Sequence, residues 1–267
     1  MSLKAPFDAI AGEYDLGFSD TYCGRVQRAR VHALLRPWLP TPGKALEINC
    51  GTGIDALWLA EAGWQVWATD ISAAMVQATR EKAERSAWSQ AITCIQADAA
   101  HLQGAFAHQQ FDVLLSDFGG LNCLSPQQLT DFGRDAAQLV RPGGLLAVVI
   151  MGRFCAWETL YFLAKRQWKQ AFRRWHTGPV EASLGHGASV PVWYYSPKKM
   201  ARSAPDFTPV GLTGVGIWAP PSYLEPLMQR WKPLRDLATW AEQRSTSPKW
   251  AALSDHYLLL LRRNAVR

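Results

Sequence analysis

The chain has 267 residues with a formal net charge of +6, and 48% of its residues are apolar. This apolar share is enough for a large core, whereas no apolar run approaches the about 20 residues that span a bilayer. The first ten residues contain Asp8 and lack a basic start followed by an apolar stretch, and the five cysteines form no C-x-x-C pair. We therefore expect a cytoplasmic protein with reduced cysteines, no secretory signal and no metal site.

The charge is divided unevenly along the chain. Residues 1–150 contain 11 Lys and Arg against 15 Asp and Glu, whereas residues 151–267 contain 17 Lys and Arg against 7 Asp and Glu. The basic character therefore belongs to the second part of the chain, where it can attract an anionic small molecule, an anionic membrane or a nucleic acid.

The first 150 residues alternate short apolar runs with helical patterns, which is typical of βαβ units and a parallel sheet. We expect strands at residues 44–48, 65–69, 92–96, 111–116 and 145–150. Helices are predicted at residues 54–62, 71–88 and 126–140. Ser72 and Ser125 are the expected N-caps of the second and third of these helices.

The second part of the chain has a different pattern. Aromatic and apolar residues recur at spacings of three and four over residues 153–175, which predicts one long amphipathic helix with a basic opposite face. Gly, Ser and Pro predict a loop over residues 176–191. Strands are expected at residues 192–195, 212–218 and 256–261, and helices at residues 197–202 and 222–242, with breaks in the last at Pro226 and Pro233.

A glycine-rich loop follows the first predicted strand, in the run Glu47-Ile48-Asn49-Cys50-Gly51-Thr52-Gly53. Glycines between a strand and a helix let a ligand approach the backbone closely, and the pattern G-x-G-x-x-A from Gly51 is typical of dinucleotide sites. Asp70 ends the second predicted strand, where a carboxylate can accept hydrogen bonds from both hydroxyls of an adenosine ribose. These features alone do not distinguish a nicotinamide enzyme from a methyltransferase.

Further features, in chain order, favour the methyltransferase. Glu47 lies inside the first strand, Asp98 follows the third, and Asp117-Phe118-Gly119-Gly120 ends the fourth. Arg-Pro-Gly-Gly precedes the fifth strand, and an apolar strand closes the chain. Over about residues 7–150 and the last strand, this series resembles the class I S-adenosylmethionine-dependent methyltransferases. The resemblance implies an α/β Rossmann-like fold with a seven-stranded sheet of order 3-2-1-4-5-7-6, its last strand antiparallel and helices on both faces.

The resemblance also implies roles for individual residues in binding S-adenosylmethionine. The implied cofactor-binding residues are Glu47, Gly51, Gly53, Asp70 and Asp98, with Ile71 and Ala99 packing on the adenine. Asp117 would lie near the methionine end of the cofactor. The opening Phe7-Asp8-Ala9-Ile10-Ala11-Gly12-Glu13-Tyr14-Asp15 resembles the F-D-x-x-A-x-x-Y-D of quinone-biosynthesis and related small-molecule methyltransferases, in which the Tyr closes over the cofactor. Tyr14 is therefore a candidate lid residue.

One position departs from the family pattern E-x-G-x-G-x-G. Asn49 stands where the family has a glycine. Because Asn tolerates the left-handed region of backbone conformation better than most residues, the turn can survive this change, and the Asn side chain is a further candidate for a cofactor contact.

We expect one methyltransferase domain over residues 1–267: N-terminal cap helices at 1–40, a cofactor-binding core at 41–150, a substrate lid at 151–212, and strands and a helix completing the sheet at 213–267. The lid candidates are Trp157, Tyr161, Trp193 and Tyr194. Aromatic rings among basic residues predict a small-molecule acceptor with an aromatic or lipid-like body and an anionic or polar group. No residue pair identifies a catalytic base, and His101 and Tyr14 are the remaining candidates.

Three other classes of protein stay open at this point. A nicotinamide-dependent oxidoreductase would share the glycine loop and Asp70, although Glu47 and the closing strand favour a methyltransferase. An RNA methyltransferase would suit the basic second part, but Asp-Phe-Gly-Gly differs from the Asn/Asp-Pro-Pro-aromatic motif of adenine-modifying enzymes, so a nucleic-acid partner is not expected. The third class is a non-catalytic module that retains the cofactor site. Residues 153–175 also fit a helix lying on a membrane surface. The oligomeric state is left open.

Overall fold

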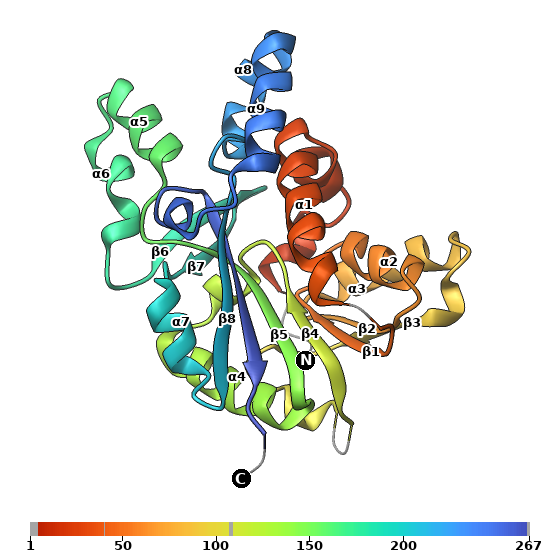
Figure 1. The fold of residues 1–267 in the computed structure, drawn as a ribbon. Helices are drawn as coiled ribbons and strands as arrows, with labels where there is room; N and C mark the ends of the chain where they lie inside the picture. The colour runs from red at the N-terminus through yellow and green to blue at the C-terminus, as the bar shows by residue number, and fades with distance from the viewer. Residues whose placement is uncertain (1–4, 40, 107–108, 266–267) are drawn as a thin grey trace.

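The computed structural model describes residues 5–39, 41–106 and 109–265, so residues 1–4 and 40 of the predicted N-terminal cap segment lie outside the described part. One seven-stranded sheet forms the centre of the molecule, with the strand order β3-β2-β1-β4-β5-β9-β8 (Figure 1). The last strand of the chain, β9, pairs antiparallel with both β5 and β8, whereas the other pairs are parallel. Since β8 and β9 are the sixth and seventh strands of this sheet in chain order, the predicted fold class and strand order are confirmed.

The strands follow the apolar runs of the sequence. Their bounds are β1 Lys44–Ile48, β2 Gln65–Asp70, β3 Ile92–Gln96, β4 Phe111–Ser116, β5 Val140–Met151, β8 Phe207–Val215 and β9 His256–Arg263. The fifth strand begins earlier than predicted, because Val140 already pairs with Phe111 before a bulge in the register. Ile48 lies opposite both Thr69 and Ser116, so the carboxyl ends of β1, β2 and β4 lie side by side.

Two apolar layers cover the faces of the sheet. On one face, Val31, Leu35 and Leu59 pack against the strands, and on the other face Phe132 and Met200 do so. The helices of the first 150 residues are α1 Tyr22–Leu35, α2 Ile54–Glu61, α3 Ala73–Glu84 and α4 Pro126–Leu139. Ser72 and Ser125 cap α3 and α4 as predicted, because their side chains accept hydrogen bonds from the N–H groups of Met75 and Gln128.

Short helical turns complete the connections between these elements. Their bounds are η1 Pro6–Ala9, η2 Asp15–Ser19, η3 Arg36–Trp38, η4 Ser89–Ala91, η5 Leu102–Gly104, η6 Gly120–Cys123, η7 Arg173–Trp175, η8 Ser222–Leu224 and η9 Pro248–Ala252. In the described residues, no helix combines the length and the apolar character that crossing a membrane requires.

The prediction of one long helix over residues 153–175 is wrong. The segment forms α5 Ala156–Ala164, α6 Trp168–Ala171 and the turn η7. The helix ends because Arg166 takes a left-handed conformation, with φ of 57°. The chain then folds back, so that Arg173 and Arg174 both bind the buried Glu158, at 2.8 and 3.0 Å. The ion pairs of a buried carboxylate with two guanidinium groups stabilise the fold more than a continuous helix over this segment would.

The prediction of a loop over residues 176–191 is also wrong, because this segment contains a hairpin of β6 Val180–Gly185 and β7 Ala188–Val192. Its turn has positive φ at both His186 and Gly187, as a tight type I′ hairpin turn requires. Of the strand predicted at residues 192–195, only Val192 belongs to a strand.

The remaining elements lie close to their predicted positions. Helix α7 spans Pro197–Ser203, and β8 begins at Phe207, inside the segment assigned to the lid and earlier than the strand predicted at residues 212–218. The segment 222–242 divides into α8 Glu225–Arg230 and α9 Lys232–Arg244. Pro226 and Pro233 each stand in the first turn of one of these helices, where a missing N–H costs nothing.

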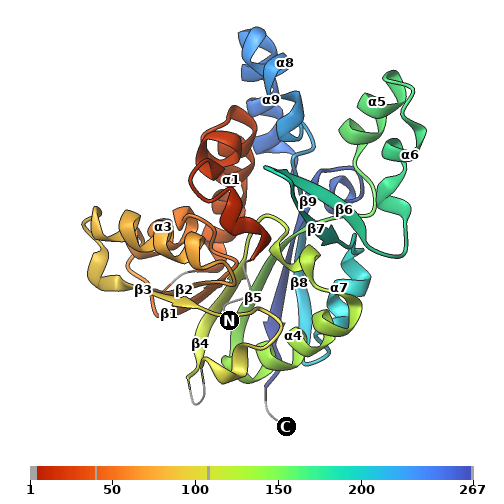
Figure 2. The same cartoon turned by 180° about the vertical axis from the view of Figure 1, so that it is seen from behind.

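The pairs α5–α6 and α8–α9 both project from the same end of the molecule, which is the upper end in Figures 1 and 2. The arrow of β9 points away from this end, and β9 runs antiparallel to β5 (Figure 1). The carboxyl ends of the parallel strands therefore point toward the end from which the two helical pairs project.

Candidate active site

A cavity of about 220 Å³ lies at the carboxyl ends of β1, β2 and β4. Ligands of open α/β sheets bind at this edge, beside the point where the strand order reverses. The cavity is lined by Phe7, Tyr14, Asn49, Gly51, Asp70, Ile71, Met75, Asp117, Phe118, Gly119, Gly120, Cys123, Met151, Ala182, Leu184, Val190 and Val192. Six of the predicted site residues therefore meet here, namely Tyr14, Asn49, Gly51, Asp70, Ile71 and Asp117.

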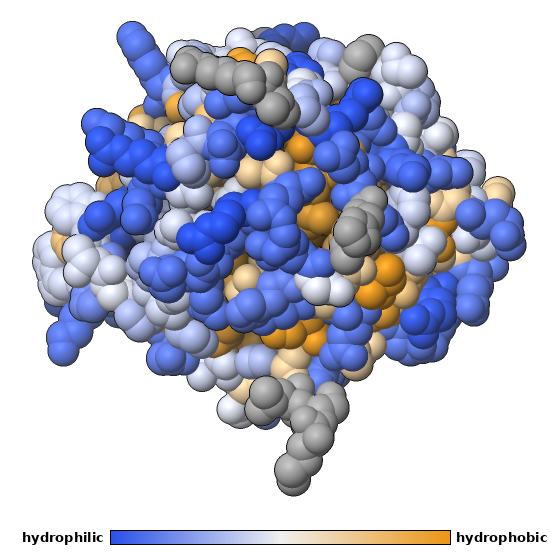
Figure 3. Space-filling view, turned by 90° about the horizontal axis from the view of Figure 1, so that it is seen from below, coloured by the Kyte–Doolittle hydropathy of each residue, from blue (hydrophilic) through white to orange (hydrophobic). Residues whose placement is uncertain are grey.

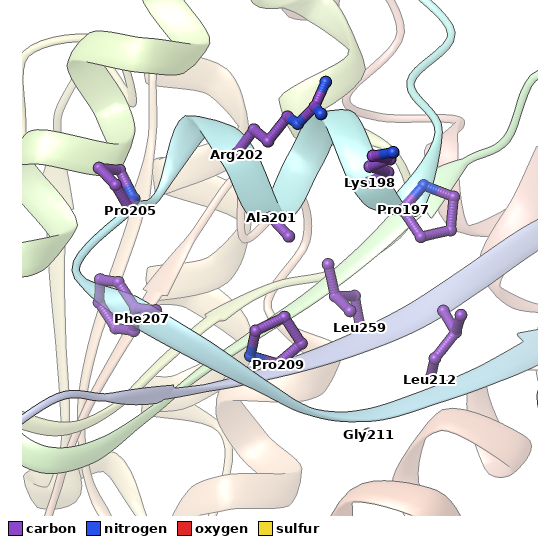
Figure 4. A pocket seen from close by; sticks show the side chains of 10 residues that line it. All are labelled: Pro197, Lys198, Ala201, Arg202, Pro205, Phe207, Pro209, Gly211, Leu212 and Leu259. Atoms are coloured by element: carbon purple, nitrogen blue, oxygen red, sulfur yellow. The ribbon is translucent and has the colours of Figure 1, made fainter.

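A larger hollow, of about 710 Å³, lies between α7 and the edge strand β8 (Figure 4). Its floor is formed by Phe207, Pro209, Leu212 and Leu259, and in Figure 4 the side chain of Arg202 points away from it. None of the predicted site residues lines this groove. Pro209 on an edge strand is a common protection against strand addition. We therefore place the functional site at the smaller cavity, where the polar groups converge.

The glycine loop has a backbone conformation that depends on its residue types. Asn49, Gly51 and Gly53 all have positive φ, at 57°, 53° and 82°. A Cβ atom on Gly53 would come within 2.5 Å of the Thr79 side chain, and the Thr79 hydroxyl donates to the Gly51 carbonyl at 2.8 Å. Helix α3 therefore holds the loop so closely that position 53 requires glycine.

Asn49 replaces the glycine of the family pattern without disturbing this loop. Its side-chain amide donates to the Ser116 hydroxyl at 3.2 Å. A Cβ atom on Gly120 would lie within 2.4 Å of the Asn49 side chain, so the missing side chain at position 120 provides the room that Asn49 needs. The departure at position 49 is thus accommodated by the Gly119-Gly120 turn after β4.

Asp70 connects the glycine loop to the start of α3. Its carboxylate accepts hydrogen bonds from the N–H groups of Gly51, at 3.1 Å, and Ser72, at 2.9 Å. Burial raises the pKa of Asp70 to about 6, because these two hydrogen bonds compensate only part of the lost hydration. The carboxylate lines the cavity and is ready to accept further hydrogen bonds from a ligand.

A group of buried acids lies under the methionine end predicted for the cofactor. Glu47 is 1% exposed, and neither its Oε2 nor Oδ2 of Asp117 has a hydrogen-bond partner among the described residues. Burial, followed by the nearby Asp55 carboxylate, raises the pKa of both groups well above the usual range. Arg28 and His32 of α1 both pair with Asp55. The cluster therefore holds three carboxyl groups close to one guanidinium, which favours binding of a cation.

Tyr14 closes the cavity from the N-terminal segment. A Cβ atom built on Gly51 would lie 3.7 Å from its ring. Burial raises the pKa of Tyr14 to about 12, so its hydroxyl remains protonated at neutral pH and acts as a hydrogen-bond donor rather than as a base. Asp15 fixes this segment, because it accepts from the Thr52 hydroxyl at 2.6 Å and pairs with Lys82 at 2.8 Å.

The other predicted cofactor residues and the second base candidate lie outside the cavity lining. Glu47 is buried in β1, Gly53 is the N-cap residue of α2, and Asp98 and Ala99 follow β3. Asp98 accepts from the Ala100 N–H at 2.8 Å and faces the His101 ring at 3.2 Å. The side chain of His101 is 77% exposed. The structure does not bring His101 into the cavity.

The hairpin β6–β7 forms the roof of the cavity. Ala182, Leu184, Val190 and Val192 line the cavity together with Cys123 and Met151, so this end of the cavity is apolar. These lining residues were not predicted from the sequence. The alternation of apolar and polar residues in Val180-Glu181-Ala182-Ser183-Leu184 was the signal that could have identified the hairpin.

None of the four lid candidates lines the cavity. The Trp157 indole donates to the Ile217 carbonyl at 2.8 Å, and Tyr161 packs on Phe162. The backbone of Trp193 is bound by Asn122, and Tyr194 is buried beneath the Arg174 guanidinium. These four aromatic residues support the fold around the roof, and the smaller aliphatic residues of the hairpin form the cavity wall.

Comparison with known proteins agrees with this geometry. The sequence model of the family described as "Methyltransferase domain" matches residues 45–144. The ubiquinone/menaquinone biosynthesis C-methyltransferase of Acidiphilium cryptum is 31% identical over 144 residues, which are 53% of this chain and 55% of that protein. A demethylmenaquinone methyltransferase of Corynebacterium urealyticum is 30% identical over 145 residues, covering 53% and 56%. The chain therefore matches about half the length of these two relatives.

A solved structure shows the same fold over most of the chain. The CcbJ methyltransferase of Streptomyces caelestis superposes with a TM-score of 0.60 at 19% identity, covering 88% of this chain and 89% of that one. An all-parallel dinucleotide-binding sheet has the order 3-2-1-4-5-6, whereas β9 here is antiparallel and inserted beside β5. Residues 45–144 thus match a methyltransferase domain, and the chain shares the fold of this solved methyltransferase.

Proposed function

We propose that this protein transfers a methyl group from S-adenosylmethionine to a small, predominantly apolar acceptor. The single observation that carries the proposal is that one cavity has Asp70 and the glycine loop at one end and the aliphatic hairpin roof at the other. The two ends fit a polar nucleoside and an apolar acceptor respectively. The quinone-related substrates in the names of the two matched relatives point to the same class of acceptor.

The residues present fit the family's cofactor. Asp70 would accept the ribose hydroxyls, and Ile71 with Met75 would contact the adenine. The unpartnered oxygens of Glu47 and Asp117 suit the ammonium group of the methionine part. Asp98 and Ala99 lie outside the described cavity, so they would contact the cofactor only where it extends beyond that cavity. Asp98 would then accept a hydrogen bond from the adenine amino group, and Ala99 would pack on the ring. When bound, S-adenosylmethionine supplies a methyl group that is already activated on a sulfonium.

The protein's main contribution would then be orientation. Holding an acceptor in line with the activated methyl group lowers the barrier by about 7–11 kcal/mol. Tyr14 and the N-terminal segment close the cofactor end, while Leu184 and Val192 exclude water from the acceptor end.

The proposal differs from the sequence-based expectation in the charge of the acceptor. Among the described residues that line the cavity, Asp70 and Asp117 are the charged ones, and no Lys or Arg is present. An anionic group on the acceptor would face these carboxylates without a counter-ion. We therefore propose a neutral acceptor whose polar group is the methylated nucleophile itself.

The cofactor is tested first, by thermal shift. S-adenosylhomocysteine should raise the melting temperature and NAD should leave it unchanged, since a ligand that binds only the folded state stabilises it. Stabilisation by NAD alone would overturn the assignment of the cavity. The Asp70→Ala variant should bind S-adenosylmethionine at least about tenfold more weakly, equivalent to about 1.4 kcal/mol.

The acceptor class is tested with neutral phenols and quinols against their carboxylated analogues, by following S-adenosylhomocysteine formation. Neutral compounds should be methylated faster. Leu184→Arg should abolish this turnover while cofactor binding persists, because the new cation replaces an apolar wall residue. Ser183→Arg, on the exposed side of the same strand, is the matched control. Faster turnover of carboxylated compounds, or methylation of RNA alone, would contradict the proposal.

A further inference from the structure

Two helical arms carry most of the exposed large apolar side chains. We define them as the α5–α6 arm, residues 156–175, and the α8–α9 arm, residues 225–244. Nine of the fifteen exposed large apolar side chains in the described residues belong to these arms, namely Leu160, Trp168, Phe172, Trp175, Leu227, Trp231, Leu234, Leu237 and Trp240. Single exposed apolar residues are ordinary, but such a concentration marks an interaction surface.

The inner faces of both arms already have partners within the chain. In the α8–α9 arm, Glu225 accepts from the N–H groups of Tyr22 and Cys23, and Met228 and Ala238 pack against the same helix. In the α5–α6 arm, Arg174 pairs with Asp255 at 2.6 Å, and the Trp157 indole donates to the Ile217 carbonyl at 2.8 Å. The exposed residues therefore belong to the outer faces. Trp168 is 63% exposed, Leu237 61% and Trp231 59%.

The charges on the outer faces are nearly all positive. Lys165, Arg166 and Lys169 are exposed on the α5–α6 arm, and Arg230, Lys232 and Arg244 on the α8–α9 arm. Within these two segments, which the structure describes completely, Asp236 is the one exposed acid, because Glu158, Glu225 and Glu242 are buried. A surface that combines Trp and Leu with Lys and Arg matches the interface of an anionic bilayer, where rings enter the headgroup region and cations meet phosphates.

The position of the arms supports one common docking plane. Both arms project from the same end of the molecule (Figures 1 and 2). The opposite end is covered mainly by hydrophilic residues, with hydrophobic residues visible only in small patches between them (Figure 3). The apolar arms and the hydrophilic end thus give the molecule two chemically different ends.

We propose that the two arms together dock the protein on an anionic lipid bilayer as a peripheral membrane protein. A second copy of this chain is a poorer occupant, because a twofold contact brings the same cationic faces together. Docking would also turn the carboxyl edge of the sheet, where the cavity lies, toward the bilayer. The inference concerns the surface alone and does not depend on the proposed methyl transfer.

The experiment is flotation of the full-length protein with vesicles of phosphatidylcholine containing phosphatidylglycerol and with vesicles of phosphatidylcholine alone. Partition into the anionic vesicles should be at least about tenfold stronger, because several Lys and Arg side chains of the arms then meet anionic headgroups. Tryptophan fluorescence should shift to the blue on binding, because the rings of the arms leave water.

Matched variants separate the arms from general hydrophobicity and charge. Leu237→Ser with Trp240→Ser should reduce partition at least about tenfold, whereas Leu16→Ser with Trp88→Ser, exposed elsewhere, should not. Lys165→Glu with Lys169→Glu should also reduce partition at least about tenfold. The control is Arg85→Glu with Arg134→Glu, which are exposed at the C-cap of α3 and on α4. Circular dichroism and thermal melts confirm that each variant is folded, which exposed positions favour.

Three results would overturn the proposal. The first is equal partition into both kinds of vesicle, or into neither. The second is an equal effect of the arm variants and the control variants. The third is a dimer in sedimentation that Leu237→Ser with Trp240→Ser converts to a monomer, which would assign the apolar faces to a second copy.

Discussion

The Asp70→Asn variant is expected to make the protein more stable and to weaken cofactor binding. Burial raises the pKa of Asp70 from 3.8 to about 6, so the ionised carboxylate costs about 3 kcal/mol in the folded state at neutral pH, at about 1.4 kcal/mol per pH unit. Asn removes this cost but can accept only one of the two hydrogen bonds, from Gly51 or Ser72, which loses about 1–1.5 kcal/mol. The net gain is about 1.5 kcal/mol, or about 3–6 °C in melting temperature.

The sign of the pH dependence provides a second test. The folded protein holds the Asp70 proton more tightly than the unfolded chain, so the penalty is absent below pH 3.8 and complete above about pH 6. The wild type therefore loses this part of its stability as the pH rises through that window. The advantage of Asp70→Asn in thermal melts should be clear at pH 7.5 and smaller at pH 5.

Cofactor binding should respond in the opposite sense. Ribose hydroxyls donate to the ionised carboxylate, so wild-type affinity for S-adenosylmethionine should fall about tenfold between pH 7.5 and pH 5, given the pKa of about 6. Asp70→Asn should bind more weakly at pH 7.5 and with a shallower pH dependence. Asp131→Asn, on the exposed side of α4, is the control and should change stability by less than about 0.5 kcal/mol. An Asp70→Asn protein that is less stable than wild type at pH 7.5 would refute the reasoning.

Three further substitutions test the surroundings of this carboxylate. Arg28→Met should lower the free energy of unfolding by about 3–5 kcal/mol in urea titrations, because Asp55 loses its buried guanidinium partner. An unchanged urea midpoint would show that Arg28 does not stabilise the buried carboxyl groups. Gly53→Ala should cost about 1–2 kcal/mol for the positive φ alone and weaken cofactor binding, whereas Gly104→Ala, in open space, should behave as wild type in the same melts. Asn49→Gly should retain cofactor affinity and stability within about 0.5 kcal/mol, because the relief of the strained φ offsets the lost bond to Ser116; a tenfold weaker affinity in calorimetry would assign Asn49 a direct contact.

The cofactor half of the site could be predicted because it depends on local sequence. The residues that matter there stand at the ends of adjacent parallel strands, and strand ends follow directly from apolar runs such as Phe111–Ser116. Once the strand order was known, Asn49, Asp70 and Asp117 had to lie near one another. Ser72 and Ser125 identified helix starts for the same reason, since capping is a property of a few consecutive residues.

The apolar end of the cavity could not be predicted because tertiary contacts determine it. The spacing of Trp157, Tyr161 and Trp168 is truly helical, but the pairing of Glu158 with residues 15 and 16 positions later requires the chain to turn back. No local pattern contains that information. The hairpin was missed for another reason. Its Gly and Ser residues indicate a loop, although Ala182 and Leu184 alternate with polar residues as in a strand. The large aromatic residues were predicted to line the site, whereas small aliphatic residues of the hairpin form the cavity wall.

The folded protein shows where the positive charge of residues 151–267 lies. Some of its cations are used internally: Arg174 binds Glu158 and Asp255, and Arg263 donates to the Ala137 carbonyl. The cavity receives none of this charge, since no Lys or Arg is among the described residues that line it. The positive charge that remains on the surface lies on the two helical arms and on α7, where Lys198, Lys199 and Arg202 are exposed. The anionic partner suggested by the net charge is therefore better sought at the surface than among the acceptors, and the vesicle and acceptor experiments test these two locations independently.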